Sequence, residues 1–240
     1  ERIRGYPVKT RQIEIAGQLY DVLGPGNYEE LVDDPRVLER FSKDEFLPYW
    51  AEFWPVCALM AEFVAAWGPA TPSKRLTILE LGCGLGLSSL VAARLGHRAI
   101  ASDYDEDALE FVRESARRMD QPIPETQFID WRETCPDLRP DRIVAAEILY
   151  ERRSLAPIAQ FFARHLPPGA IGLICDAIRH TADDFPAIAA EAGLVVQTIV
   201  LQPRTEQPQK MPPARLFELR HKPDAKIATE QITLWTSPNR

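Results

Sequence analysis

The sequence predicts an α/β fold with a mostly parallel sheet of about seven strands, an antiparallel pair at one edge, and helices on both faces. Strand-like and helix-like segments alternate from residue 76 onward, which is typical of parallel strands joined by crossover helices. The last two apolar segments, 194–201 and 216–220, have no helix between them, so we expect them to pair antiparallel. A glycine-rich turn at 82–86 follows the first strand and predicts a ligand site at that end of the sheet.

The segment before this core, residues 1–75, is predicted to hold small strands and helices that pack on it. Its expected elements are a hairpin at 12–23, short helices at 28–32 and after Pro35, an aromatic segment at 47–55 and a helix at 56–67. The hairpin is predicted from alternating apolar and polar residues, and the last helix from apolar residues that recur with a period of about 3.6.

The core is predicted to span residues 76–222, and with the extension it forms one structural domain. The expected strands are 77–81, 98–102, 126–129, 142–149, 170–177, 194–201 and 216–220. The expected helices are 87–95, 105–119, 155–166 and 185–192. A polar tail, 223–240, follows, and its one apolar stretch at 232–235 is a candidate edge strand.

The bulk composition limits the classes of function. The net charge is −7, which disfavours binding to a nucleic acid backbone and fits a small-molecule or protein partner better. No apolar run is long enough to span a membrane, and the first residues lack the apolar stretch of a signal peptide. The four scattered cysteines suggest neither a metal site nor a disulfide framework. We therefore expect a cytoplasmic protein without a bound metal, and a monomer.

The glycine turn is the first candidate site. Glu80 ends the first strand, and the glycines that follow, Gly82 and Gly84, let a ligand approach the backbone closely. Asp103 ends the next strand, where a carboxylate can accept hydrogen bonds from the two hydroxyls of a ribose, with Tyr104 beside it. A tight structural turn is the alternative. A nicotinamide cofactor is disfavoured, because its fingerprint would need a third glycine at position 87.

Three further groups of residues stand at predicted strand ends or just before the core. Asp130 and Trp131 could bind an adenine through its amino group and its ring face, although a capping Asp and a core Trp would look the same. Glu147 and Tyr150 follow an apolar strand and could face a cationic acceptor, or they could cap a helix and pack in the core. Trp54 lies in the aromatic segment and could contact a charged cofactor, or merely cover the core.

The turn after the first strand, Glu80 to Gly86, resembles motif I of the class I S-adenosylmethionine-dependent methyltransferases. Together with the Trp-Pro block at 48–55 and Glu147-x-x-Tyr150, it is similar to the D/E-x-x-Y protein lysine methyltransferases, above all those acting on the electron-transfer-flavoprotein β-subunit. The resemblance covers roughly residues 47–201. It departs from the group's usual pattern at position 147, where Asp is common and this chain has Glu.

The resemblance implies the seven-stranded, Rossmann-like class I fold, with S-adenosylmethionine as cofactor and S-adenosylhomocysteine as product. By resemblance, the cofactor would contact Trp54, Glu80, Gly82, Gly84, Asp103, Tyr104, Asp130, Trp131 and Glu147. Glu147 and Tyr150 would be the catalytic pair facing the acceptor. The function expected is methylation of a lysine side chain of a protein substrate. The alternatives are a small-molecule N- or O-methyltransferase and an inactive methyltransferase-like binding module.

Overall fold

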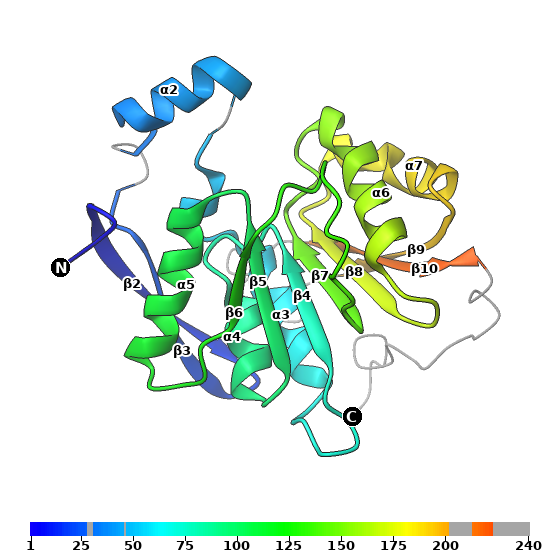
Figure 1. The fold of residues 1–240 in the computed structure, drawn as a ribbon, viewed down its shortest axis with the longest axis horizontal. Coiled ribbons are helices and arrows are strands. Elements are labelled where there is room, and N and C mark those ends of the chain that lie inside the picture. The colour runs from blue at the N-terminus through cyan, green and yellow to red at the C-terminus, as the bar shows by residue number, and fades with distance from the viewer. Residues whose placement is uncertain (28–30, 46, 202–212, 223–240) are drawn as a thin grey trace.

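A computed structural model of the chain describes residues 1–27, 31–45, 47–201 and 213–222 (Figure 1). The helix expected at 28–32 lies partly outside these residues, and the edge strand expected at 232–235 lies wholly outside them. Within the described ranges, no helix combines the length and apolar character that crossing a bilayer requires.

A seven-stranded sheet forms the centre of the molecule (Figure 1). Its strands are β4 (Thr77–Leu81), β5 (Arg98–Asp103), β6 (Glu125–Phe128), β7 (Arg142–Ala146), β8 (Ile171–Asp176), β9 (Leu194–Leu201) and β10 (Ala214–His221). Their spatial order is β6-β5-β4-β7-β8-β10-β9, parallel except that β10 runs opposite to both of its neighbours. The predicted fold is confirmed, with the reversed strand second from the edge.

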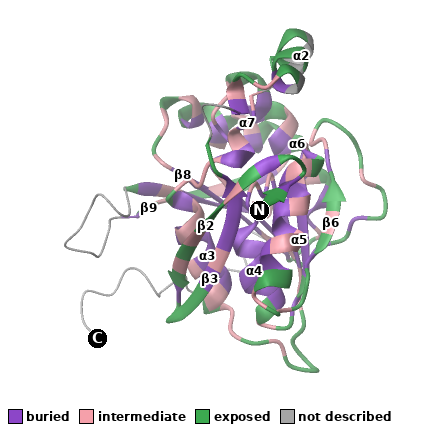
Figure 2. Cartoon of the chain, turned by 90° about the vertical axis from the view of Figure 1, so that its left-hand side faces the viewer, coloured by how far each residue is buried: buried purple, intermediate pink, exposed green. Residues whose placement is uncertain are grey.

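Helices cover both faces of this sheet. They are α3 (Val56–Ala66), α4 (Leu87–Arg94) and α5 (Glu106–Arg118) on one face, and α6 (Leu155–His165) and α7 (Phe185–Glu191) on the other. Side chains of β4 alternate between two apolar clusters, so Ile78 packs with the first helix group and Leu79 with the second. Figure 2 shows this burial concentrated in the sheet and on the inward sides of the helices.

The N-terminal segment folds into a separate three-stranded antiparallel sheet. Its strands are β1 (Arg2–Ile3), β2 (Tyr6–Ile15) and β3 (Gln18–Pro25). The hairpin is therefore longer than the predicted 12–23. It packs against α5, where the Leu23 amide donates to the Ser115 hydroxyl at 2.9 Å, and its buried residues join the first apolar cluster.

Short elements link this sheet to the core. They are α2 (Pro35–Asp44), which extends from the body of the molecule in Figures 1 and 2, and a 3-10 turn at Tyr49–Ala51. Two further 3-10 turns, Arg152–Ser154 and His180–Asp184, lie within the core and precede α6 and α7. The predicted boundary at residue 75 stays a prediction.

One strand ends earlier than its apolar sequence predicts. β7 stops at Ala146, whereas we expected it to continue to residue 149. Glu147 has φ +59°, a left-handed conformation that an extended strand cannot contain. The chain therefore turns at Glu147, while its amide still donates to the Cys175 carbonyl of β8 at 2.9 Å.

The turn between β4 and α4 needs glycine on conformational grounds. Gly82, Gly84 and Gly86 all have positive φ, at 63°, 52° and 72°. A Cβ atom on Gly86 would overlap the Val112 side chain of α5, so this glycine also allows α4 and α5 to pack closely. The alternating glycines are therefore needed for the backbone conformation of the turn, whether or not a ligand binds there.

We expect Gly86→Ala to lower the free energy of unfolding by about 2–5 kcal/mol, because left-handed strain and overpacking add. Gly169→Ala is the matched control: Gly169 has φ +81°, but a Cβ atom at this position would have no neighbour within 4 Å. The control should therefore lose only the strain, about 1–2 kcal/mol. Urea denaturation of both variants measures the difference. Equal losses of unfolding free energy would show that the Val112 side chain can move aside without a measurable energetic penalty.

Candidate active site

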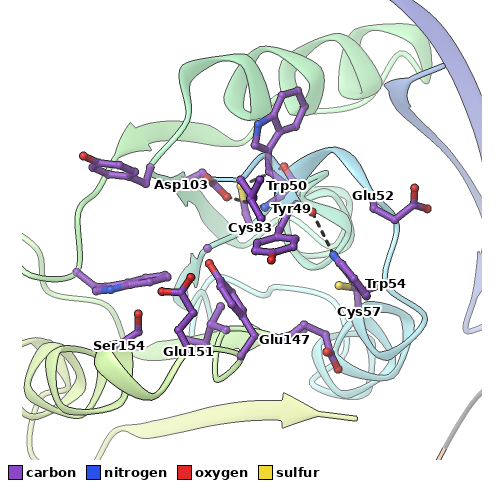
Figure 3. Close-up of a pocket in the computed structure, with 18 of the residues that line it drawn as sticks. Tyr49, Trp50, Glu52, Trp54, Cys57, Cys83, Asp103, Glu147, Glu151 and Ser154 are labelled. Atoms are coloured by element: carbon purple, nitrogen blue, oxygen red, sulfur yellow. Dashed lines mark hydrogen bonds between the residues drawn. The ribbon is translucent and has the colours of Figure 1, made fainter. Parts of the chain in front are cut away.

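A cavity of about 440 Å³ opens at the carboxyl ends of β4, β5 and β7 (Figure 3). Its volume is in the range of small-molecule sites, and its position is where open α/β sheets bind ligands. The predicted site residues that line it are Trp54, Gly82, Gly84, Asp103, Tyr104, Asp130, Trp131, Glu147 and Tyr150. The structure therefore brings together residues that are nearly a hundred positions apart in the sequence.

Glu80 is the predicted site residue that does not line the cavity. Its side chain is buried, and its carboxylate accepts hydrogen bonds from the amides of Ser88 (3.3 Å) and Ser89 (2.8 Å) in the first turn of α4. Burial raises the pKa of Glu80, and the two amides oppose that rise. We expected Glu80 to contact the cofactor. In the structure it caps a helix N-terminus and so holds the glycine turn in place.

Asp103 faces the glycine turn from the end of β5. One carboxylate oxygen accepts a hydrogen bond from the Gly84 amide at 2.8 Å. Burial raises the pKa of Asp103 to about 7, because water no longer stabilises the charged form. Near neutral pH this carboxyl can therefore lose a proton when a ligand brings hydrogen-bond donors to it.

Asp130 carries a partner that the sequence analysis did not foresee. The Arg132 guanidinium binds its carboxylate at 2.6 Å and lies 5.3 Å from the centre of the Tyr104 ring. Burial raises the pKa of Asp130, but Arg132 outweighs it and the net shift is downward. Asp130 is thus held ionised at the cavity wall next to Trp131, whose ring would lie 3.5 Å from a Cβ atom on Gly82.

Aromatic side chains form the opposite wall. The Tyr49 ring lies 5.0 Å from that of Tyr150 and 6.5 Å from that of Trp54, both in edge-to-face arrangements. The Trp54 indole N–H donates to the Tyr49 carbonyl at 3.1 Å, which fixes the orientation of the indole (Figure 3). These contacts give the cavity a rigid face on which a cation can rest.

Glu147 lies at the base of this aromatic wall. Its side chain is buried, and the Arg179 guanidinium binds one carboxylate oxygen through Nε at 2.9 Å and also through Nη2. The other oxygen, Oε1, is buried without a hydrogen-bond partner among the described residues. Burial raises the pKa of Glu147 and Arg179 opposes that rise. Oε1 can accept a hydrogen bond from a donor that enters the cavity.

Residues 50–222, more than half of the chain, match the model of a family described as a methyltransferase domain. The chain belongs to this methyltransferase family. The family uses S-adenosylmethionine, so the predicted cofactor is confirmed. Membership of the D/E-x-x-Y lysine methyltransferases stays a prediction.

Relatives of this methyltransferase include enzymes named for protein substrates. It is 32% identical over 132 residues to a ribosomal protein L11 methyltransferase of Bradyrhizobium diazoefficiens, covering 51% of this chain and 42% of that protein. It is 28% identical over 123 residues to the human histone-arginine methyltransferase METTL23, covering 48% of this chain and 64% of that protein. The matches thus span less than two thirds of either relative.

Solved structures share the fold of this methyltransferase. A TehB-like methyltransferase from Corynebacterium glutamicum aligns with 82% of this chain and 100% of its own, with a TM-score of 0.55 and 15% identity. At that identity the likeness establishes the fold alone, and it agrees with the observed strand order.

Two arginines that pair with site carboxylates, Arg132 and Arg179, were not predicted from the sequence as site residues. Each follows the end of a strand by a few residues, and this position is the feature of the sequence that could have identified them as site residues. The nearby His180 is fully exposed, lies 3.3 Å from an Asp183 carboxylate oxygen and does not line the cavity. Among the described residues, no group of three or more His, Cys, Asp or Glu side chains is placed to hold a metal ion.

Proposed function

We propose that this protein transfers a methyl group from S-adenosylmethionine to a nitrogen nucleophile, and that the acceptor is a lysine side chain of a protein. The observation that carries the proposal is Glu147, buried beside Tyr150 and Trp54 with one oxygen unpartnered. That oxygen suits an N–H donor, and the surrounding aromatic faces suit a cation or its neutral amine.

The cavity fits the cofactor on three grounds. The glycine turn brings the backbone to the cavity surface, where a side chain on Gly82 would collide with Ile148. Asp103 offers a carboxylate for a ribose diol, and Asp130 with Trp131 offers an acceptor and a ring face for adenine. The aromatic wall suits a positively charged sulfur. When bound, S-adenosylmethionine supplies an electrophilic methyl group on that sulfur and leaves as S-adenosylhomocysteine.

The protein's own contribution is to position and desolvate the acceptor. A nitrogen must present an unshared electron pair, so a lysine must lose a proton whose usual pKa is about 10.4. A dry aromatic channel formed by Tyr49, Trp54 and Tyr150 favours the neutral amine. Glu147 orients that amine through its free oxygen, and the proton leaves to water. Positioning of this kind accounts for most of the rate in such transfers.

Two relatives support a protein acceptor, since they are named as methyltransferases of ribosomal protein L11 and of histone arginine. The test is to incubate the protein with a dialysed cell extract and methyl-labelled S-adenosylmethionine, and to identify the labelled residues by mass spectrometry. Label on lysine in a protein supports the proposal. Label confined to small molecules, or to another side chain, would overturn the lysine assignment, and no label at all would refute methyl transfer.

We expect the affinity for 5′-methylthioadenosine to rise about tenfold between pH 6 and pH 8, as Asp103 ionises. This compound carries the nucleoside but no group that titrates in this range, so the change reports on the protein. The sign follows from the pKa of about 7: below it Asp103 is neutral and a weaker acceptor for ribose hydroxyls, and above it the carboxylate is already charged.

Calorimetry at several pH values measures this dependence. Binding below pH 7 should release a proton to the buffer, so the observed heat should vary with the buffer's ionisation enthalpy. The same titration of Asp103→Asn should be flat, and a pH-independent affinity in the wild type would rule out Asp103 as the ribose ligand.

A further inference from the structure

Arg179 contacts the site from outside the cavity. It follows β8 in a loop where Ile178 has φ +59°, and it does not line the cavity itself. Its guanidinium binds Glu147 Oε2, and its central carbon lies 5.4 Å from the centre of the Trp54 ring. Arg179 therefore touches two residues of the cavity wall while leaving Oε1 of Glu147 free.

A buried clamp holds Arg179 in this position. Its amide donates to Asp176 Oδ1 at 2.8 Å, and Asp176 is completely buried at the end of β8. Arg215, paired with Asp176 in the register of β10 and β8, binds the same carboxylate at 3.4 Å and donates to the Arg179 carbonyl at 2.5 Å. The backbone of Arg179 is thus fixed on both sides by groups from two strands, and this positions its side chain for the contact to Glu147.

The charges around Glu147 explain why it needs this partner. Cys57 from α3, and Cys175 and Asp176 from β8, face it, and Asp176 together with burial disfavours its ionised form. Among the described residues, Arg179 is the cation that pairs with it. Without that cation the pKa of the buried carboxyl would rise further, with the Ala177 amide still opposing the rise, and a protonated carboxyl is a poorer acceptor.

We propose that Arg179 is a positioning residue for the methyl acceptor: it binds one oxygen of the Glu147 carboxylate, keeps the group ionised, and leaves the other oxygen free to accept an N–H from the acceptor nitrogen. This inference rests on the proposed function. Because the Glu147–Arg179 pair carries no net charge, it does not stabilise an ammonium ion, as a lone carboxylate would. The pair therefore selects acceptors that enter as neutral amines, and it disfavours carboxylate or phenolate acceptors, which bring no donor.

The first test needs no reaction. Infrared spectra of the protein alone at pH 7 should show an additional protonated-carboxyl band in Arg179→Ala that is absent from the wild type and from Arg179→Ala/Glu147→Gln. Arg179→Lys retains a cation and should lack the band. A spectrum of Arg179→Ala identical to that of the wild type would overturn the inference. The control is Arg152→Ala, which removes an exposed ion pair with Asp184 and should not change the spectrum.

The second test is the pH profile of label transfer into a dialysed cell extract. Arg179→Ala should lower the initial rate at pH 7 by about tenfold or more and move the rising limb about one unit to alkaline pH. Arg179→Lys should restore most of both. An unchanged profile with a lower melting temperature would show a purely structural role. If the wild type transfers no label, the proposed function fails, whereas the infrared result still decides whether Arg179 keeps Glu147 ionised.

Discussion

Asp103→Asn is expected to weaken the binding of S-adenosylmethionine about 100-fold. Hydrogen bonds to a charged acceptor contribute about 1.5–3 kcal/mol each, and the ribose diol offers two. Asparagine keeps the size of the side chain but loses the charge, and one of its two acceptor positions becomes a donor. Its remaining oxygen can still accept from the Gly84 amide, so the glycine turn should keep its shape.

The stability of this variant separates binding from folding. Burial raises the pKa of Asp103 to about 7, above its value in the unfolded chain, so the neutral carboxyl favours the fold. That contribution is complete below the pKa of the unfolded chain, about 4, and is lost as the pH rises from there to 7. At pH 8 the neutral asparagine should therefore melt at the same temperature as the wild type or higher, although it binds the cofactor poorly.

Asp107→Asn is the matched control. Asp107 lies in the first turn of α5, four residues after Asp103, pairs with Arg4 at 2.6 Å and does not line the cavity. Its replacement should leave cofactor affinity unchanged in calorimetry. Equal affinity for the wild type and Asp103→Asn would mean that the nucleoside lies elsewhere in the cavity and that the ribose assignment is wrong.

The parts of the fold that follow from local pattern could be predicted from the sequence. Alternating strand and helix segments determine a parallel sheet, and a missing helix before residues 216–220 indicates the reversed strand. Gly82 and Gly84 were recognisable as a site because Glu80 precedes them and Asp103 ends the next strand. These features depend on residues that are close together in the sequence, so they can be predicted from local sequence patterns.

The parts of the site that depend on distant residues could not be predicted. Arg179 binds Glu147 because β7 and β8 are adjacent, and Arg215 supports it because of the register of β10. The turn at Glu147 was missed because residues 148 and 149 are as apolar as the strand before them. Glu80 was assigned to the ligand because it lies near the end of a strand. Position in a strand, however, does not show whether a carboxylate faces the cavity or the N-terminus of the next helix.

Glu147→Gln is expected to reduce methyl transfer about 100-fold, the loss that misplacing a reacting group by about 1 Å can cause. Glutamine retains the length and shape of the side chain, so the acceptor pocket should keep its form. It removes the charge that pairs with Arg179, and leaves a guanidinium whose side chain is 33% exposed without its main partner. The remaining oxygen must then serve either Arg179 or the acceptor amine, and a neutral oxygen holds the amine less firmly.

The effect should fall on transfer rather than on cofactor affinity, because the nucleoside contacts assigned to Asp103, Asp130 and Trp131 are untouched. Measuring label transfer and, by calorimetry, the affinity for S-adenosylmethionine distinguishes an effect on transfer from an effect on cofactor binding. Glu218→Gln is the control: that glutamate is also buried and pairs with Arg220 at 2.6 Å, but it does not line the cavity. If Glu147→Gln kept both its affinity and its transfer rate, the unpartnered oxygen would have no part in catalysis, and the acceptor would have to enter from another side of the cavity.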